Sequence, residues 1–353
     1  MRDKKIALIT GITGQDGAYL AQFLLNKGYE VYGTFRRISS PNFWRLQALG
    51  IESKVNLIPA DITDFSSVLD AVKFTSADEI YHLAAQSFVG ASFESPIATE
   101  QITGTSTLNL LEAIRNTNLE AKFYFAATSE LFGNSSHDIK INEETPFSPA
   151  SPYAAAKLYS YWITKIYGES YGIFTASGIL FNHESELRGL EFVTRKISNS
   201  VAKIHLGLSN KLELGNLDSK RDWGYAPEYI KAMWLMVQQD HPENFVIATG
   251  EKHTVKEFVE EAFNYVNLDW TKYVSVKKGL LRPLDVNDLA GDYSKAEREL
   301  GWKPKTLFRD LVKKMVDADI QRWGKWLKGE IVPFDAPYYE EGVLNIVTRG
   351  MRI

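Results

Sequence analysis

The sequence contains no cysteine and no long apolar run. The absence of cysteine excludes disulfide bonds and thiolate metal sites, and we expect no bound metal. No stretch approaches the roughly 20 apolar residues of a membrane-spanning helix. The apolar run at residues 6–10 is also too short for the core of a signal peptide. We therefore expect a cytoplasmic protein that makes no contact with a membrane.

The chain also lacks an excess of positive charge. Its 353 residues include 40 Lys and Arg against 44 Asp and Glu, which gives a formal net charge of -4. Proteins that hold nucleic acid usually present a basic surface, so nucleic acid is not an expected partner. Any phosphate group that binds must be held by local geometry.

Short β-rich runs alternate with helical patterns through the first half of the chain. A helix is expected over residues 103–115, and strands are expected over residues 6–10, 30–34, 55–58, 79–83 and 122–127. This alternation predicts an α/β fold with a doubly wound parallel sheet of the Rossmann type. The nearly continuous apolar character of the strands agrees, because both faces of such a sheet are covered.

The alternation breaks at about residue 181, where longer loops separate helices such as the one expected over residues 192–206. This change predicts a smaller, interleaved substrate-binding lobe of mixed α/β structure. We divide the chain into a Rossmann domain over residues 1–180, to which later segments return, a lobe over residues 181–330, and a C-terminal extension over residues 331–353.

A glycine-rich turn follows the first predicted strand. Glycines at this spacing allow a tight turn and the close approach of a pyrophosphate, and the helix behind them offers free N–H groups. The spacing is G-x-x-G-x-x-G, and a turn without a ligand is the alternative. The residues expected to hold a dinucleotide here are Gly11, Thr13, Gly14, Gln15, Asp16 and Gly17.

The second predicted strand is followed by Arg36 and Arg37, where an NAD site usually has an acidic residue. Two guanidinium groups suit the extra 2′-phosphate of NADP, although a solvated surface pair is the alternative. Further cofactor contacts are expected after the third strand, at Asp61 and Ile62, and after the fourth, at Leu83, Ala84, Ala85 and Ser87.

The segment from Ser151 to Lys157 predicts a helix start that carries chemistry. Ser151 is a good N-cap and Pro152 suits the first helical position, which places Tyr153 and Lys157 on one face. A nearby cation favours the phenolate form of a tyrosine, and the ammonium group can also bind the nicotinamide ribose. The segment therefore predicts an alcohol-oxidation centre, with an unrelated surface pair as the alternative.

Thr128 and Glu130 follow the fifth predicted strand, at the sheet edge where such folds bind their ligands. Thr128 can bind a substrate hydroxyl. Oxidation of an alcohol needs only this hydroxyl, Tyr153 and Lys157, so Glu130 is an additional base that can reach the next carbon. Dehydration needs such a base, whereas a salt-bridged structural carboxylate is the alternative.

Together these motifs resemble the extended short-chain dehydrogenase/reductases and, over roughly residues 5–325, are similar to the GDP-mannose 4,6-dehydratases. The segments that carry the resemblance are GITGQDG (11–17), LAAQSFVG (83–90), TSELFG (128–133), NHES (182–185), FVTRK (192–196), KRDWG (220–224) and residues 291–302, which end in LGW.

The resemblance implies a lyase that uses tightly bound NADP. Tyr153 would take the proton of the C4 hydroxyl while hydride passes from C4 to NADP+. Glu130 would then remove the C5 proton, water would leave from C6, and the hydride would return to C6. The product would be a GDP-4-keto-6-deoxy sugar. GDP-mannose is the expected substrate, with a GDP-heptose or a GDP-N-acetylhexosamine left open.

The resemblance also implies that the first domain binds NADP and the second lobe mainly the nucleotide sugar. His183 and Arg188 would lie on the NADP side, and a contribution of Arg188 across a subunit interface is the alternative to one within its own subunit. The residues that would hold the GDP-sugar are Ser87, Glu130, Asn182, Thr194, Lys196, Gly215, Asn216, Arg221, Arg282 and Asp285.

Three details weaken single assignments. Asp285 stands where the family usually has Glu, Glu186 stands where it usually has proline, and residues 194–196 would also fit a solvated helix face. A nucleotide-sugar epimerase or reductase, and an NADP-binding regulatory protein, are the rival functions.

The family commonly pairs subunits through the helix that carries Tyr153, so we expect a homo-oligomer, either a dimer or a tetramer. Leu158, Tyr161, Trp162 and Tyr167 on that helix are consistent with burial in such an interface.

Overall fold

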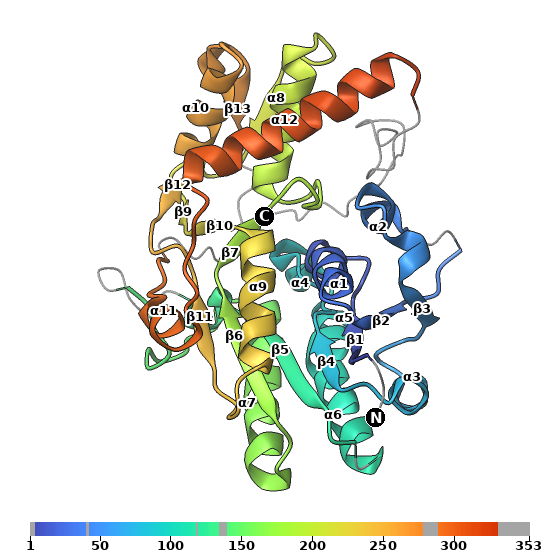
Figure 1. Cartoon of the computed structure of the whole chain (residues 1–353). Coiled ribbons are helices and arrows are strands. Elements are labelled where there is room, and N and C mark those ends of the chain that lie inside the picture. The colour runs from blue at the N-terminus through green and yellow to red at the C-terminus, as the bar shows by residue number, and fades with distance from the viewer. Residues whose placement is uncertain (1–3, 40–41, 118, 134–139, 278–288, 331–353) are drawn as a thin grey trace.

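A parallel sheet of seven strands forms the centre of the molecule (Figure 1). The computed structural model describes residues 4–39, 42–117, 119–133, 140–277 and 289–330. In sheet order the strands are β11 (Phe245–Ile247), β6 (Thr175–Leu180), β5 (Lys122–Thr128), β4 (Glu79–His82), β1 (Ile6–Thr10), β2 (Glu30–Phe35) and β3 (Asn56–Pro59). The order reverses beside β1, as in a doubly wound Rossmann sheet. The predicted fold class is therefore confirmed, and β6 and β11 are strands that the sequence had not singled out.

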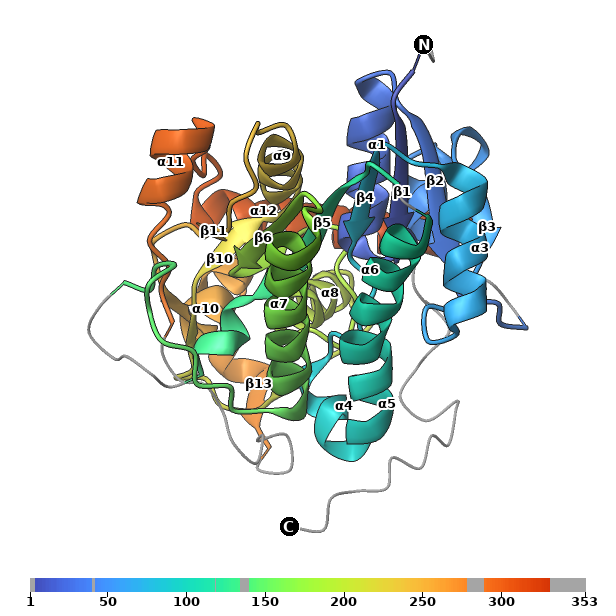
Figure 2. The ribbon, with the colours of Figure 1, turned by 90° about the horizontal axis from the view of Figure 1, so that it is seen from below.

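Both faces of the sheet are covered by helices, which explains the continuous apolar strands. Along β1, Ala7 and Ile9 face one core, whereas Ile6 and Leu8 face the other. The first core is closed by α1 (Gln15–Asn26), α9 (Ala226–Val237) and α11 (Ser294–Leu300). The second is closed by α3 (Phe65–Thr75), α6 (Ser106–Thr117) and α7 (Pro152–Tyr171), which lie side by side in Figure 2.

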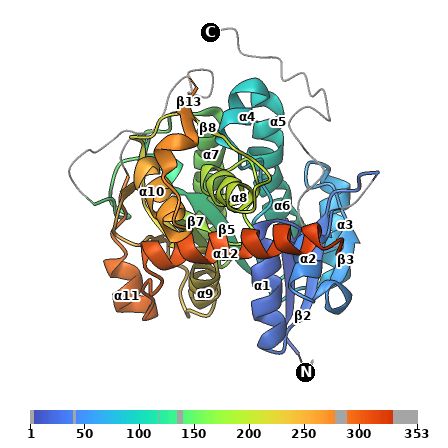
Figure 3. The same ribbon diagram turned by 90° about the horizontal axis from the view of Figure 1, so that it is seen from above.

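A second lobe with its own apolar core lies beyond the carboxyl ends of the strands (Figure 3). Three helices build it: α8 (Val193–His205), α10 (Val255–Tyr265) and α12 (Phe308–Leu327). Its short strands are β7 (Asn182–Glu184), β8 (Leu212–Leu214), β9 (Lys220–Arg221), β10 (Trp223–Tyr225), β12 (His253–Thr254) and β13 (Val274–Val276). Because α9 and β11 return to the large sheet between parts of this lobe, the two halves are interleaved in sequence.

Shorter elements complete the described part of the chain. They are α2 (Trp44–Ala48), η1 (Glu52–Lys54), α4 (Val89–Glu94), α5 (Pro96–Glu100), the π-helical turn η2 (Gln101–Thr105), η3 (Ser129–Phe132) and η4 (Trp270–Lys272). Within the described ranges, no helix combines the length and the apolar character needed to cross a membrane.

The predicted start of the Tyr153 helix is confirmed. The Ser151 hydroxyl accepts a hydrogen bond from the Ala154 N–H over 3.1 Å, and Pro152 is the first residue of α7. The assignment of α7 side chains to a subunit interface is partly wrong. Tyr161 and Tyr167 are buried inside the subunit, in the second core, where Tyr161 packs against Phe147 and the Tyr167 hydroxyl donates to Glu112 of α6. Trp162, by contrast, is exposed.

Candidate active site

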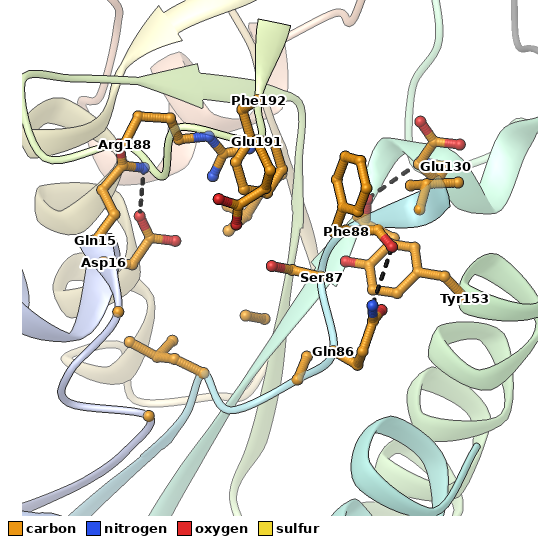
Figure 4. A pocket seen from close by; sticks show the side chains of 18 of the residues that line it. Gln15, Asp16, Gln86, Ser87, Phe88, Glu130, Tyr153, Arg188, Glu191 and Phe192 are labelled. Carbon is orange, nitrogen blue, oxygen red and sulfur yellow. Dashed lines mark hydrogen bonds between the residues drawn. The ribbon is translucent and has the colours of Figure 1, made fainter. Parts of the chain in front are cut away.

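One cavity of about 900 Å³ opens where the strands of the large sheet end and the second lobe begins. Ligands bind at this edge in open α/β sheets, because the loops that leave the carboxyl ends of the strands diverge there. In Figure 4, Arg188 and Asp16 lie at one end of the cavity, Glu130 and Tyr153 lie at the other, and Ser87 points into the space between them. The cavity thus joins the two groups of predicted residues.

The glycine-rich turn fits the backbone of a dinucleotide. Gly11 has a φ of +76°, and a Cβ atom there would lie 2.9 Å from the backbone of Ala84. A Cβ atom on Gly17 would lie 2.3 Å from the Gly11 carbonyl oxygen. Glycine is therefore required at both positions, one for the turn and one for the packing of α1 against it. All six predicted residues of this turn line the cavity.

The two arginines after β2 differ in their position relative to the cavity. Both are exposed, but Arg36 lines the cavity and Arg37 does not. Asp61 lies close enough for the Arg36 charge to act on it, yet its pKa is lowered mainly by hydrogen bonds from the Thr63 N–H and hydroxyl. Ile62 is held by its carbonyl oxygen, which accepts from the Asn109 amide over 3.0 Å. The remaining predicted cofactor residues, Leu83, Ala84, Ala85 and Ser87, line the cavity as well.

The four predicted catalytic residues lie in one part of the cavity. Lys157 is 3% exposed, and its Nζ donates a hydrogen bond to the Ala126 carbonyl oxygen on β5 over 2.6 Å. Thr128 ends β5, and its hydroxyl accepts from the Glu130 N–H in the short turn η3. From that turn Glu130 lines the cavity, and it is 9% exposed. Among the described residues, no hydrogen bond or ion pair engages the Glu130 carboxylate.

In the protein alone, burial has the largest effect on the ionisation of Tyr153 and of Lys157. Burial raises the pKa of Tyr153, and the negative charge of Glu130 raises it further, against the opposing effect of the Thr128 hydroxyl. Burial also lowers the pKa of Lys157 to about 7, although Asp16 attracts the charge. Removal from water disfavours the charged form of both groups, and the presence of ligands in the cavity would alter that environment.

His183 and Asp16 form a pair across the two halves of the molecule. His183 Nε2 lies 2.8 Å from the Asp16 Oδ2, and His183 Nδ1 lies 2.7 Å from the Phe181 carbonyl oxygen. Gln15 donates to Asp16 over 3.0 Å and to the His183 carbonyl oxygen over 3.1 Å. Burial alone would raise the pKa of Asp16, but the charge and hydrogen bond of His183 lower it to about 2.

The segment that begins α8 is not a solvated face. Thr194 is 1% exposed and Arg195 is fully buried. The Thr194 hydroxyl donates to Glu184 Oε2 over 2.6 Å, and the same oxygen lies 3.1 Å from Nε of Arg188. Arg188 therefore lies in the cavity of its own subunit, with its guanidinium 3.5 Å from the centre of the Phe192 ring.

Six of the other predicted substrate residues line the cavity, and the remaining two lie outside the described residues. Those that line it are Ser87, Asn182, Lys196, Gly215, Asn216 and Arg221. Arg282 and Asp285 lie outside the described residues.

Several lining residues were missed by reasoning from the sequence. Gln101 and Ile102 reach the cavity from the π-helical turn, which local sequence does not reveal. Glu184 was visible only as one letter of the NHES segment. Asp222 is buried, and it accepts hydrogen bonds from the backbone N–H groups of Thr249, Gly250 and Gly291. Asp222 does not itself line the cavity, but these bonds fix the chain directly after Arg221, the last residue of β9.

Comparison with known proteins identifies the family. The family described as GDP-mannose 4,6 dehydratase matches residues 8–315. The chain belongs to the GDP-mannose 4,6-dehydratase family. Its relatives include GDP-mannose 4,6 dehydratase 1 of Arabidopsis thaliana, 47% identical over 350 residues that cover 96% of this chain and 95% of the relative. The GDP-mannose 4,6 dehydratase of Homo sapiens is 48% identical, over 91% of this chain and 92% of its own length.

Solved structures show how widely this family shares its fold. The UDP-glucose 4-epimerase of Thermus thermophilus in complex with NAD is 26% identical and superposes with a TM-score of 0.78, over 89% of this chain and 98% of its own. The dTDP-glucose 4,6-dehydratase of Bacillus anthracis, also with NAD, is 19% identical with a TM-score of 0.79, over 92% and 99%. The second likeness shows the fold alone.

Proposed function

We propose that this member of the GDP-mannose 4,6-dehydratase family converts GDP-mannose to its 4-keto-6-deoxy derivative. The observation that carries the proposal is the position of Glu130. Its buried carboxylate lines the same cavity as Thr128, Tyr153 and Lys157, and no partner among the described residues holds it elsewhere. A base that is not engaged in an ion pair can accept a proton from the substrate.

The chain's own residues divide the reaction between them. Thr128 orients the C4 hydroxyl, and Tyr153 takes its proton. The resulting ketone acidifies the C5 hydrogen, which Glu130 removes as water leaves C6. When bound, a nicotinamide supplies the hydride acceptor at C4 and the donor at C6. Lys157, fixed by the Ala126 carbonyl oxygen, is placed to bind the ribose beside it.

NADP is the proposed cofactor. The glycine cradle at Gly11 and Gly17 supports a dinucleotide, and a guanidinium at Arg36 supports the 2′-phosphate. Residues 1–180 would provide most of this site. His183 and Arg188 would complete it from the lobe.

The GDP moiety is assigned to the lobe, over residues 181–330. Thr194 and Lys196 lie in the first turns of α8, where free N–H groups and a cation favour a diphosphate. Arg221 adds a second cation from β9, 9% exposed. Neither feature distinguishes one hexose from another.

Mass spectrometry of the products tests the proposal. The purified chain with NADP and GDP-mannose should yield a product lighter by one water. A GDP-heptose, a GDP-N-acetylhexosamine and a UDP-hexose would be tested in parallel, since the first two are the alternative substrates. An epimerase would leave the mass unchanged and a reductase would add two hydrogens. A regulatory protein would yield no product.

We also propose that the protein is a homo-oligomer and that it works in the cytoplasm, and the exposed apolar residues of the Tyr153 helix support the first of these two proposals. Tyr159, Trp162 and Ile166 are exposed on α7, and Ile97 is 74% exposed on the neighbouring α5. Exposed apolar side chains on neighbouring helices are typical of a subunit interface. Sedimentation velocity would give the oligomeric state.

A further inference from the structure

Four residues that follow β7 form a strap between the two halves of the molecule. The strap is defined as residues 185–188, Ser-Glu-Leu-Arg. Its first hydroxyl, on Ser185, donates to Gln15 Oε1 at the start of α1 over 2.7 Å. The Ser185 hydroxyl oxygen also accepts a hydrogen bond from the Leu187 N–H over 3.0 Å, which curls the strap back on itself. Arg188, the last residue, lines the cofactor half of the cavity.

Three arginines hold three successive carbonyl oxygens of the strap. Arg195 donates from Nη1 to Glu186 over 3.1 Å and to Arg188 over 2.8 Å. Arg322 donates from Nη2 to the same Glu186 oxygen over 2.6 Å. Arg45 donates from Nε to the Leu187 oxygen over 2.7 Å and from Nη1 to the Thr13 oxygen of the glycine turn over 3.1 Å.

Two of these arginines, Arg195 and Arg322, are anchored on a buried carboxylate of α12, and the three arginines together are called the clamp. Asp319 is 1% exposed and accepts from Nε of Arg195 over 2.9 Å and from Nη1 of Arg322 over 2.9 Å. The Ser198 hydroxyl donates to it over 2.6 Å. One carboxylate thus orients two guanidinium groups, whose other N–H donors point at the strap. Charge-assisted hydrogen bonds of this kind are short and directional, so they fix the path of the backbone.

The Glu186 side chain ties the strap to both halves at once. Its carboxylate accepts from the Tyr19 hydroxyl on α1 over 3.1 Å and from the Tyr225 hydroxyl on β10 over 3.3 Å. A proline, which the family usually has here, offers neither bond. The strap of this chain therefore carries a connection of its own between the first helix and the lobe.

We propose that the strap is a positioning element that retains the dinucleotide, with Arg322, Arg195 and Arg45 as positioning residues that act through Arg188. The inference depends on the proposed function, because a hydride removed from C4 must return to C6 of the same sugar. A cofactor that left between the two steps would leave the sugar half reacted. Slow dissociation is therefore part of the chemistry, and the clamp supplies it by holding Arg188 in place.

Dissociation of NADPH from the full chain tests the strap. NADPH would be bound, chased with excess NADP+, and followed by its fluorescence. We expect Arg322→Gln to accelerate NADPH dissociation about tenfold, which corresponds to about 1.4 kcal/mol. The reason is that the Glu186 carbonyl oxygen loses one of its two guanidinium hydrogen-bond donors. Arg322→Lys keeps the charge and should restore part of the retention. GDP affinity, measured by calorimetry, should stay within about twofold, since the GDP half of the cavity is untouched.

Arg309→Gln is the matched control. Arg309 lies on the same helix, but it is 81% exposed and pairs with Glu261 on the surface. The Arg309→Gln variant should change neither the NADPH dissociation rate nor the GDP affinity. An unchanged NADPH dissociation rate in Arg322→Gln would overturn the strap's role. Equal weakening of NADPH binding and GDP binding, with a matching loss of thermal stability in the ligand-free chain, would show a general folding defect. That result would also overturn the strap's role. A wild-type chain that binds no NADPH would overturn the proposed function as well.

Discussion

His183 and Asp16 are joined by a 2.8 Å contact across 167 residues of sequence, and the second ring nitrogen of His183 faces the Phe181 carbonyl oxygen. A carboxylate and a carbonyl can only accept, so both nitrogens are satisfied only when both carry a proton. The ring is then a cation beside a carboxylate. This pairing allows a carboxylate to lie in a turn built for a pyrophosphate, because its charge is already compensated.

Replacing Asp16 should therefore change both the titration of His183 and the stability of the fold. Burial lowers the pKa of His183, but the charge and hydrogen bond of Asp16, together with the Phe181 carbonyl oxygen, raise it, and the net shift is upward from 6.5. The pKa of Asp16 is lowered from 3.8 to about 2. The Asp16 contribution to stability is present above pH 3.8 and is lost as the pH falls toward 2. The His183 contribution is complete below pH 6.5 and is lost as the pH rises through its raised pKa.

We expect Asp16→Asn to cost about 1–2 kcal/mol, mostly between about pH 4 and 6.5. Urea unfolding across this range would measure the loss, and NMR titration of the His183 ring would show the lower pKa. Asp64→Asn removes a helix-capping carboxylate elsewhere and should leave the His183 titration unchanged. A His183 pKa that did not fall in Asp16→Asn would contradict the pairing.

Lys157→Met should stabilise the fold while it abolishes activity. Since the folded pKa of Lys157 is about 7 and the unfolded value is 10.5, the buried ammonium costs stability below about pH 7. This cost fades as the pH rises from 7 to 10.5. We expect the melting temperature at pH 6 to rise by about 2 °C or more, with no gain near pH 10.5. Lys165→Met, an exposed lysine on the same helix, should show no such dependence. Equal melting temperatures at both pH values would contradict the lowered pKa.

Arg36 and Arg37 should contribute unequally to cofactor choice. Because only Arg36 lines the cavity, we expect Arg36→Ser to weaken NADP binding by about tenfold or more, the effect of losing one charge-assisted contact. NAD binding should change little, since it lacks the 2′-phosphate. Arg37→Ser is the matched control and should alter neither cofactor strongly. Fluorescence titrations with both reduced cofactors would decide the matter, and equal losses for NADP and NAD would refute the role of Arg36.

Glu130→Gln should separate oxidation from elimination. The amide cannot take the C5 proton, so turnover should fall by about 10²–10⁴, whereas hydride transfer from C4 remains possible through Tyr153. Reduced cofactor should accumulate in a single turnover and be visible in the near-ultraviolet absorbance. Glu94→Gln, on the exposed surface of α4, is the control. Full dehydration by the Glu130 variant would remove it from the mechanism.

The sequence alone predicted the elements whose signals are local. The alternation of strands and helices, the glycine turn and the Ser151–Pro152 helix start depend on neighbours within a few residues, so periodicity and capping chemistry were enough. The same applies to the place of Glu130 directly after β5. Resemblance to a family then supplied the roles of residues that no local pattern marks.

Only the tertiary structure decided what surrounds each group. Arg195 looked like part of a solvated face but is buried against Asp319, 124 residues away. Tyr153 and Lys157 were correctly placed on one helix, yet their pKa shifts follow from a burial that packing creates. The strap, the Asp16–His183 pair and the different positions of Arg36 and Arg37 likewise join distant parts of the chain. Burial and electrostatics depend on those long-range contacts, which a one-dimensional pattern does not contain.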